Sequence, residues 1–115
     1  MEIIEPPSPN FDARPAGAGI DMLVIHYTGM TDAAAALERM RDAAAKVSSH
    51  YFIGEDGAIY RLVDEAHRAW HAGVSFWRGI TDCNARSIGI ELQNPGHEFG
   101  YRDFPDAQMR ALEWL

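Results

Sequence analysis

The chain has 115 residues, of which 47% are hydrophobic and 23% are charged. This length fits one domain, and this composition excludes an intrinsically disordered chain. The formal net charge of −7 argues against a nucleic-acid partner, because phosphate contacts need lysine and arginine. No apolar run approaches the ~18–20 residues that span a bilayer. The single cysteine, Cys83, and the lack of a visible signal peptide favour a cytoplasmic protein.

The first half of the chain predicts an arm, a strand and a helix. Residues 1–20 are rich in proline and glycine, which predicts an extended arm with no packed element. The continuous apolar run at residues 22–27 is typical of a strand that is buried on both faces in the centre of a sheet. Residues 32–46 are rich in alanine and carry one apolar stripe at helical spacing, so they predict a helix capped by Thr31.

The second half predicts three more strands and a further helix. Residues 49–53 and 58–63 are strand-like runs joined by a glycine-rich turn, which indicates a β-hairpin. Residues 64–86 predict a long irregular loop, of the kind that often carries function in a small domain. Residues 87–92 read as another strand, and residues 104–115 open a helix. This order predicts an α/β fold, a small mixed β-sheet with helices packed against it.

Two residues stand out as candidates for chemistry. His26 lies at the carboxyl end of the apolar strand, where α/β proteins place ligands, and a neutral imidazole there can bind zinc. The alternative is a histidine whose hydrogen bonds are satisfied within the core. Glu91 ends another apolar strand, and a carboxylate is costly to bury unpaired. It either faces solvent at a sheet edge or acts as a general base beside a metal-bound water.

The predicted loop brings aromatic and polar side chains together. Trp70, His71 and Trp77 combine rings with hydrogen-bonding groups, which suits a glycan or peptide ligand. The alternative is that the tryptophans only cover the core. His50 could line the same cleft or serve in packing or a turn.

Several motifs occur along the chain in a fixed order. They are Val24-Ile25-His26-Tyr27-Thr28, Ser48-Ser49-His50-Tyr51, Trp70-His71-Ala72-Gly73 with Trp77-Arg78-Gly79, and Asn84 followed by Ser87-Ile88-Gly89-Ile90-Glu91 and Asn94. From about residue 22 to residue 115 the chain closely resembles the zinc-dependent N-acetylmuramoyl-L-alanine amidases of the type 2 amidase family. That family shares its fold with the peptidoglycan recognition proteins.

The resemblance implies hydrolysis of the amide bond between N-acetylmuramic acid and the L-alanine of the peptidoglycan stem peptide. The substrate would be a muropeptide or a peptidoglycan fragment. His26 would be a zinc ligand, and Glu91 would activate the zinc-bound water. The cleft for the muramyl-peptide would be lined by His50, Trp70, His71, Trp77 and Asn94.

The zinc site is where the chain departs from the family pattern. The family uses two histidines and one aspartate or cysteine, and its later ligands follow the helix on which this chain ends. The remaining ligands are therefore expected beyond residue 115, and the fragment itself is expected to be inactive or weakly metallated. On this view residues 21–115 are the N-terminal two-thirds of a single amidase domain, after the arm at residues 1–20.

Three other interpretations remain open. The first is a non-catalytic peptidoglycan-binding module, which would not need a water-activating Glu91. The second is a different zinc enzyme with ligands drawn from His26, His50 and His71, although no two of these have the i, i+4 spacing of a metalloprotease helix. The third is an unrelated interaction domain. The location is open as well, since some relatives act in the cell envelope and the motif around Trp77 resembles theirs.

Overall fold

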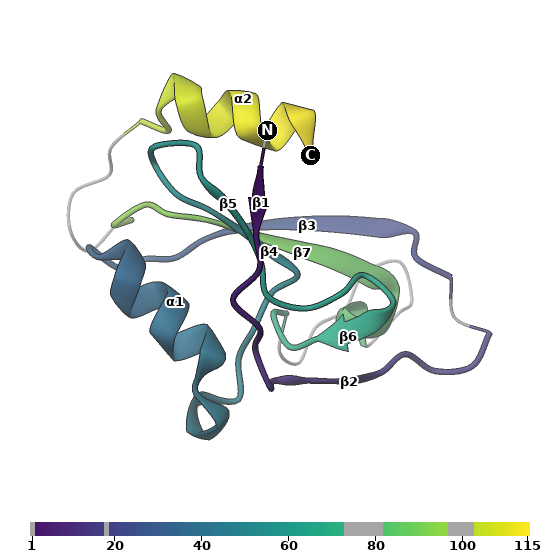
Figure 1. The fold of residues 1–115 in the computed structure, drawn as a ribbon. Coiled ribbons are helices and arrows are strands. Elements are labelled where there is room, and N and C mark those ends of the chain that lie inside the picture. The colour runs from purple at the N-terminus through teal and green to yellow at the C-terminus, as the bar shows by residue number, and fades with distance from the viewer. Residues whose placement is uncertain (1, 18, 73–81, 97–102) are drawn as a thin grey trace.

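The computed structural model describes residues 2–17, 19–72, 82–96 and 103–115. A five-stranded mixed sheet in the order β1-β5-β4-β7-β3 separates two helices, and β2 and β6 form a second small sheet (Figure 1). This confirms the predicted α/β class. The elements are β1 (Ile3–Ile4), β2 (Phe11–Ala13), β3 (Met22–Tyr27), α1 (Ala33–Arg41), β4 (Tyr51–Ile53), β5 (Ile59–Arg61), β6 (His67–Ala69), β7 (Ser87–Leu92) and α2 (Asp106–Trp114).

The pairing of the strands decides which side chains share a face. β7 lies between β3 and β4 and is parallel to both, whereas β4 and β5 form the predicted antiparallel hairpin. In this register His26 stands beside Glu91, and Glu91 stands beside Phe52. Side chains of paired positions point to the same side of a sheet, so these three share one face.

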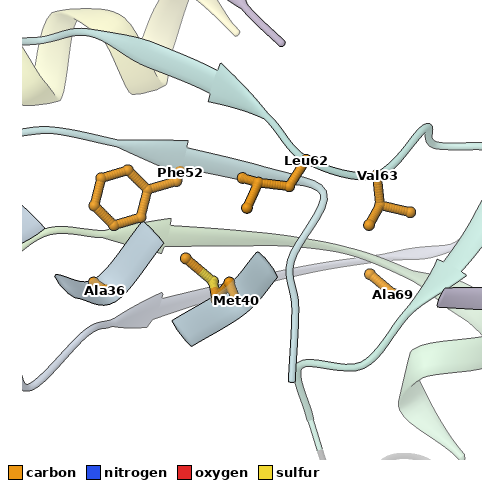
Figure 2. Close-up of a cluster of buried hydrophobic side chains, with 6 residues drawn as sticks. All are labelled: Ala36, Met40, Phe52, Leu62, Val63 and Ala69. Carbon is orange, nitrogen blue, oxygen red and sulfur yellow. The ribbon is translucent and has the colours of Figure 1, made fainter. Parts of the chain in front are cut away.

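Each face of the sheet has its own apolar core. On the α1 side, Ala36 and Met40 of the helix pack against Phe52 and the segment after β5 (Figure 2). On the other side, Ala111 of α2 packs against alternate residues of β4 and β7. Alternation along β7 therefore sends Ile90 to the α2 side and Glu91 to the α1 side.

The predicted strand at residues 22–27 has the right bounds, but its predicted position is wrong. β3 is an edge strand, and Leu23, Ile25 and Tyr27 on its α2 side are 58%, 49% and 45% exposed. The central strand is β7. An apolar run indicates a strand but not its neighbours, because those neighbours are distant in sequence.

The prediction that residues 1–20 carry no packed element is also wrong. β1 pairs with β5, and β2 pairs with β6, a strand inside the segment predicted as an irregular loop. Ser8 and Asn10 are buried between these strands, and the Asn10 amide donates to the carbonyl of Val47 over 2.9 Å. Proline removes only its own N–H donor, so the residues between the prolines remain free to pair.

The first helix is shorter than predicted, and the second agrees with the prediction. Asp32, not Thr31, caps α1, since its carboxylate accepts the N–H of Ala34 over 3.0 Å. The helix ends at Arg41, and a separate 3₁₀ turn follows at Ala43–Ala45. α2 begins directly after Pro105, and its apolar side packs on the sheet.

Candidate active site

A chain of three polar side chains lies on the α1 side of β3 and β7. Nε2 of His26 is 3.0 Å from Nδ1 of His71, and Nε2 of His71 is 2.9 Å from the hydroxyl oxygen of Ser87. His26 and Ser87 come from two neighbouring strands, while His71 reaches them from the segment that follows β6. Two predicted site residues, His26 and His71, are thus in direct contact.

The local backbone holds His71 in this position. The side-chain oxygen of Asn84 accepts the N–H groups of both His71 and Ala72, over 3.1 and 2.9 Å. Below the ring, β7 carries Gly89, and a Cβ built there would lie 2.5 Å from the His71 ring. The imidazole therefore occupies the space that any other residue at position 89 would fill.

Glu91 lies next to this group in an environment that favours the protonated carboxyl. Its Oε2 is buried and has no hydrogen-bond partner among the residues that the structure describes, and burial raises the pKa of Glu91 to about 7. A cavity of about 250 Å³ opens beside it, lined also by Thr28 and by Arg39 of α1. A carboxyl with this pKa can both take up and release a proton near neutral pH.

The neighbouring histidines have lowered pKa values, in contrast to the raised pKa of Glu91. Burial lowers the pKa of His26 and His50, and it lowers the pKa of His71 to about 3, with further lowering from the charges of His26 and His50. All three are therefore neutral near pH 7, the form in which an imidazole nitrogen can bind a metal. The arrangement can present neutral nitrogen donors beside a protonatable carboxyl.

His50 lies beneath the site and is fully buried. Its Nδ1 accepts the N–H of Gly89 over 3.0 Å, and its Nε2 lies 2.8 Å from the carbonyl oxygen of His67. An acceptor at Nδ1 and a carbonyl at Nε2 fix the tautomer with the proton on Nε2. The structure thus joins His50 to the backbone of β7 and β6.

Three other predicted residues have different surroundings. Trp70 is partly buried. Its carbonyl accepts the N–H of Ser48 over 2.8 Å, and its own N–H donates to the hydroxyl oxygen of Ser48 over 3.0 Å. Asn94 is buried where β7 ends, and its carbonyl accepts the hydroxyl of Thr28 over 3.1 Å. Trp77 lies outside the described residues.

A complete metal site is not formed by the residues that the structure describes. Within them, no group of three or more histidine, cysteine, aspartate or glutamate side chains is placed to hold an ion. His26, His50 and His71 therefore do not make the alternative zinc site.

Comparison with known proteins decides the family. The family model for N-acetylmuramoyl-L-alanine amidase matches residues 16–115. The chain belongs to this amidase family. It is 40% identical to the N-acetylmuramoyl-L-alanine amidase AmiD of Escherichia coli over 87% of this chain and 40% of that protein. It is 35% identical to the 1,6-anhydro-N-acetylmuramyl-L-alanine amidase AmpD of Citrobacter freundii over 92% of this chain and 65% of that protein.

Solved structures of amidases share the fold. A crystal structure of an AmpD derivative superposes with a TM-score of 0.81 at 34% identity, over 96% of this chain and 69% of that one. E. coli AmiD, in complex with anhydro-N-acetylmuramic acid-L-Ala-D-γ-Glu-L-Lys, superposes with a TM-score of 0.72 at 39% identity, over 85% and 42%. The chain therefore spans about two-fifths of AmiD and about two-thirds of AmpD.

Four residues of the site have roles that sequence reasoning did not assign. Asn84, Ser87 and Gly89 lie inside the quoted motifs, but only the structure shows that they surround His71. Arg14 gave no signal at all, because it lies in the predicted arm. Its guanidinium donates to the carbonyls of Ser87, over 2.8 Å, and of Asn84, over 3.1 Å.

Proposed function

We propose that this chain carries part of a zinc-dependent amidase site that cleaves the bond between N-acetylmuramic acid and the L-alanine of the peptidoglycan stem peptide. Glu91 beside His26 is the observation that supports it most. A carboxyl with one orphaned, buried oxygen and a pKa of about 7 is poorly explained as a structural group, because an unpaired buried polar atom costs stability. The same properties suit a general base.

In this proposal each residue has a defined task. His26 supplies one zinc ligand, and the ligands that complete the centre lie outside residues 1–115, as the greater length of the relatives suggests. Zinc bound there would supply a Lewis acid for amide hydrolysis. Glu91 accepts a proton from the attacking water at its carboxylate and passes it to the leaving nitrogen of L-alanine.

We propose that the substrate enters along the cavity beside Glu91. Arg39 and Thr28 line that cavity and offer a cation and a hydroxyl to a polar, anionic ligand. The other proposed substrate contacts are Trp70, His71, Trp77 and Asn94, of which Trp77 lies outside the described residues. A direct contact from His50 remains a proposal too, although its burial places it behind the site. We propose an anhydro-muropeptide as the substrate class, because AmpD is named a 1,6-anhydro-N-acetylmuramyl-L-alanine amidase and AmiD was solved with an anhydro-muropeptide.

The location is proposed as the cytoplasm. The sequence has a single cysteine, Cys83, so it cannot form an internal disulfide, which fits a reducing compartment. No helix that the structure describes has the length and apolar character needed to cross a bilayer. Cell fractionation with an antibody against the chain tests this, and enrichment in the envelope fraction would contradict it.

The proposal is tested first by reading the gene past the codon for Leu115. We expect a further histidine and an acidic ligand in the same frame. The product of that frame is then incubated with zinc and an anhydro-muropeptide, and release of the free stem peptide is followed by mass spectrometry. Glu91→Gln should abolish release, whereas Glu113→Gln, on the exposed side of α2, should not. Binding without turnover would favour the non-catalytic peptidoglycan-binding module.

A further inference from the structure

Both ring nitrogens of His71 are already occupied within the protein. Nδ1 faces Nε2 of His26 at 3.0 Å, and Nε2 faces the hydroxyl of Ser87 at 2.9 Å. The ring is also confined from below, because the backbone at Gly89 leaves no room for a side chain. So much restraint on one imidazole indicates that its orientation matters to a neighbour.

That neighbour is His26. Its Nε2 is engaged by His71, and its Nδ1 has no hydrogen-bond partner in the part of the chain that the structure describes. The two hydrogen bonds that join Ser87, His71 and His26 can point in either direction, because a hydroxyl and a neutral imidazole can each donate and accept. Nδ1 of His26 keeps a free lone pair only when Nε2–H of His26 donates to Nδ1 of His71 and Nε2–H of His71 donates to Ser87. In the reverse direction Nδ1 of His26 carries the proton.

We propose that His71, held by Ser87, is a positioning residue that fixes the ring of His26 and leaves Nδ1 as its ligating atom. A metal-bound histidine in a protein almost always has its second nitrogen held by a hydrogen bond, and that bond sets the tautomer and the ring orientation. The usual partner is a carboxylate, a carbonyl or a water, whereas here it is a second imidazole backed by a hydroxyl. The identity of the ion rests on the function proposed above, whereas the restraint on the ring does not.

The restraint is tested on the metal-free chain by nitrogen-15 spectra of the histidine rings. We expect one tautomer of His26 to dominate and a ring N–H proton shared with His71 to exchange slowly. His71→Ala should remove that proton and leave His26 averaging between both tautomers. His71→Asn places an amide oxygen near the position of Nδ1 and should restore part of the preference. Ser87→Ala should weaken it in the same direction as His71→Ala.

Ser49→Ala is the matched control. This serine is also fully buried, but its hydroxyl donates to the carbonyl of Tyr51 over 2.8 Å and touches none of the three residues. Its variant should leave the His26 spectrum unchanged. An unchanged His26 tautomer ratio in a folded His71→Ala protein would overturn the proposal. If that variant fails to fold, the ratio in Ser87→Ala and His71→Asn decides in the same way.

Titration with zinc chloride of the product of the full reading frame, which carries the remaining ligands of the proposed centre, separates this proposal from the proposed function. If both hold, zinc shifts the Nδ1 resonance of His26, and His71→Ala weakens binding by about 10- to 100-fold. Coordination through Nε2 would overturn the role assigned to His71. If zinc reaches neither nitrogen while the metal-free spectra behave as expected, the restraint on the ring stands and His26 as a zinc ligand is refuted.

Discussion

Gly89→Ala probes the tightest contact in the site. The new methyl carbon would lie 2.5 Å from two atoms of the His71 ring, far inside the 3.4–4 Å of ordinary contact. If the ring stays, overpacking of this kind costs about 1–3 kcal/mol. If the ring moves away, its bonds to His26 and Ser87 are lost, at roughly 0.5–1.5 kcal/mol each. Both routes predict a loss of roughly 2 kcal/mol in the free energy of unfolding.

Urea unfolding followed by tryptophan fluorescence measures this loss. Gly19→Ala is the control, since nothing lies within 4 Å of a Cβ at that position, and its midpoint should stay or rise slightly. A double-mutant cycle gives the sharper test, because in a His71→Ala background the methyl group has the space of the missing ring. The cost of Gly89→Ala should then fall below about 1 kcal/mol. An undiminished cost would refute the packing argument.

Three further predictions concern single residues. Because burial raises the pKa of Glu91 from 4.5 to about 7, the native state holds a proton that the unfolded chain releases, so stability falls as pH rises through that window. Glu91→Gln should flatten this slope in urea midpoints between pH 5 and pH 8, by on the order of 3 kcal/mol at the upper end. Arg14→Ala should cost about 2–4 kcal/mol in a thermal melt, because it strips a charged donor from several carbonyls, whereas the exposed Arg110→Ala should be nearly neutral. Gln108 is fully buried and donates to the carbonyls of Ile53 and Gln93 over 3.0 Å, so Gln108→Glu should destabilise more than Gln108→Ala as judged by denaturation midpoints.

Local patterns in the sequence predict much of this fold. The strands at residues 22–27 and 87–92 have the predicted bounds, and the glycine-rich turn between β4 and β5 forms the predicted hairpin. These features depend on neighbours in the sequence, namely apolar runs, turn residues and helical spacing. The family resemblance adds the proposed roles of His26 and Glu91, and the register places these two residues side by side.

Features that depend on distant partners could not be predicted. Nothing local to residues 22–27 shows that this strand lies at the edge of the sheet, because its place depends on β7. Arg14 has no local signature either, since the carbonyls that it binds lie more than fifty residues away. The restraint on His71 needs Gly89 on another strand, where glycine matters for space and not for a turn.

The strand order also constrains the time at which the protein can fold. β7 joins β3 to β4, yet it follows both of them along the chain. During synthesis the ribosome must therefore release the apolar β3 long before β7, its partner strand among the described residues, exists. Until then the β4–β5 hairpin is the one pairing of sequence neighbours in the described sheet that can form. A topology dominated by such distant pairings folds slowly, and the unpaired strand is open to misassociation meanwhile. We expect the nascent chain to depend on chaperones until residue 92 has left the exit tunnel.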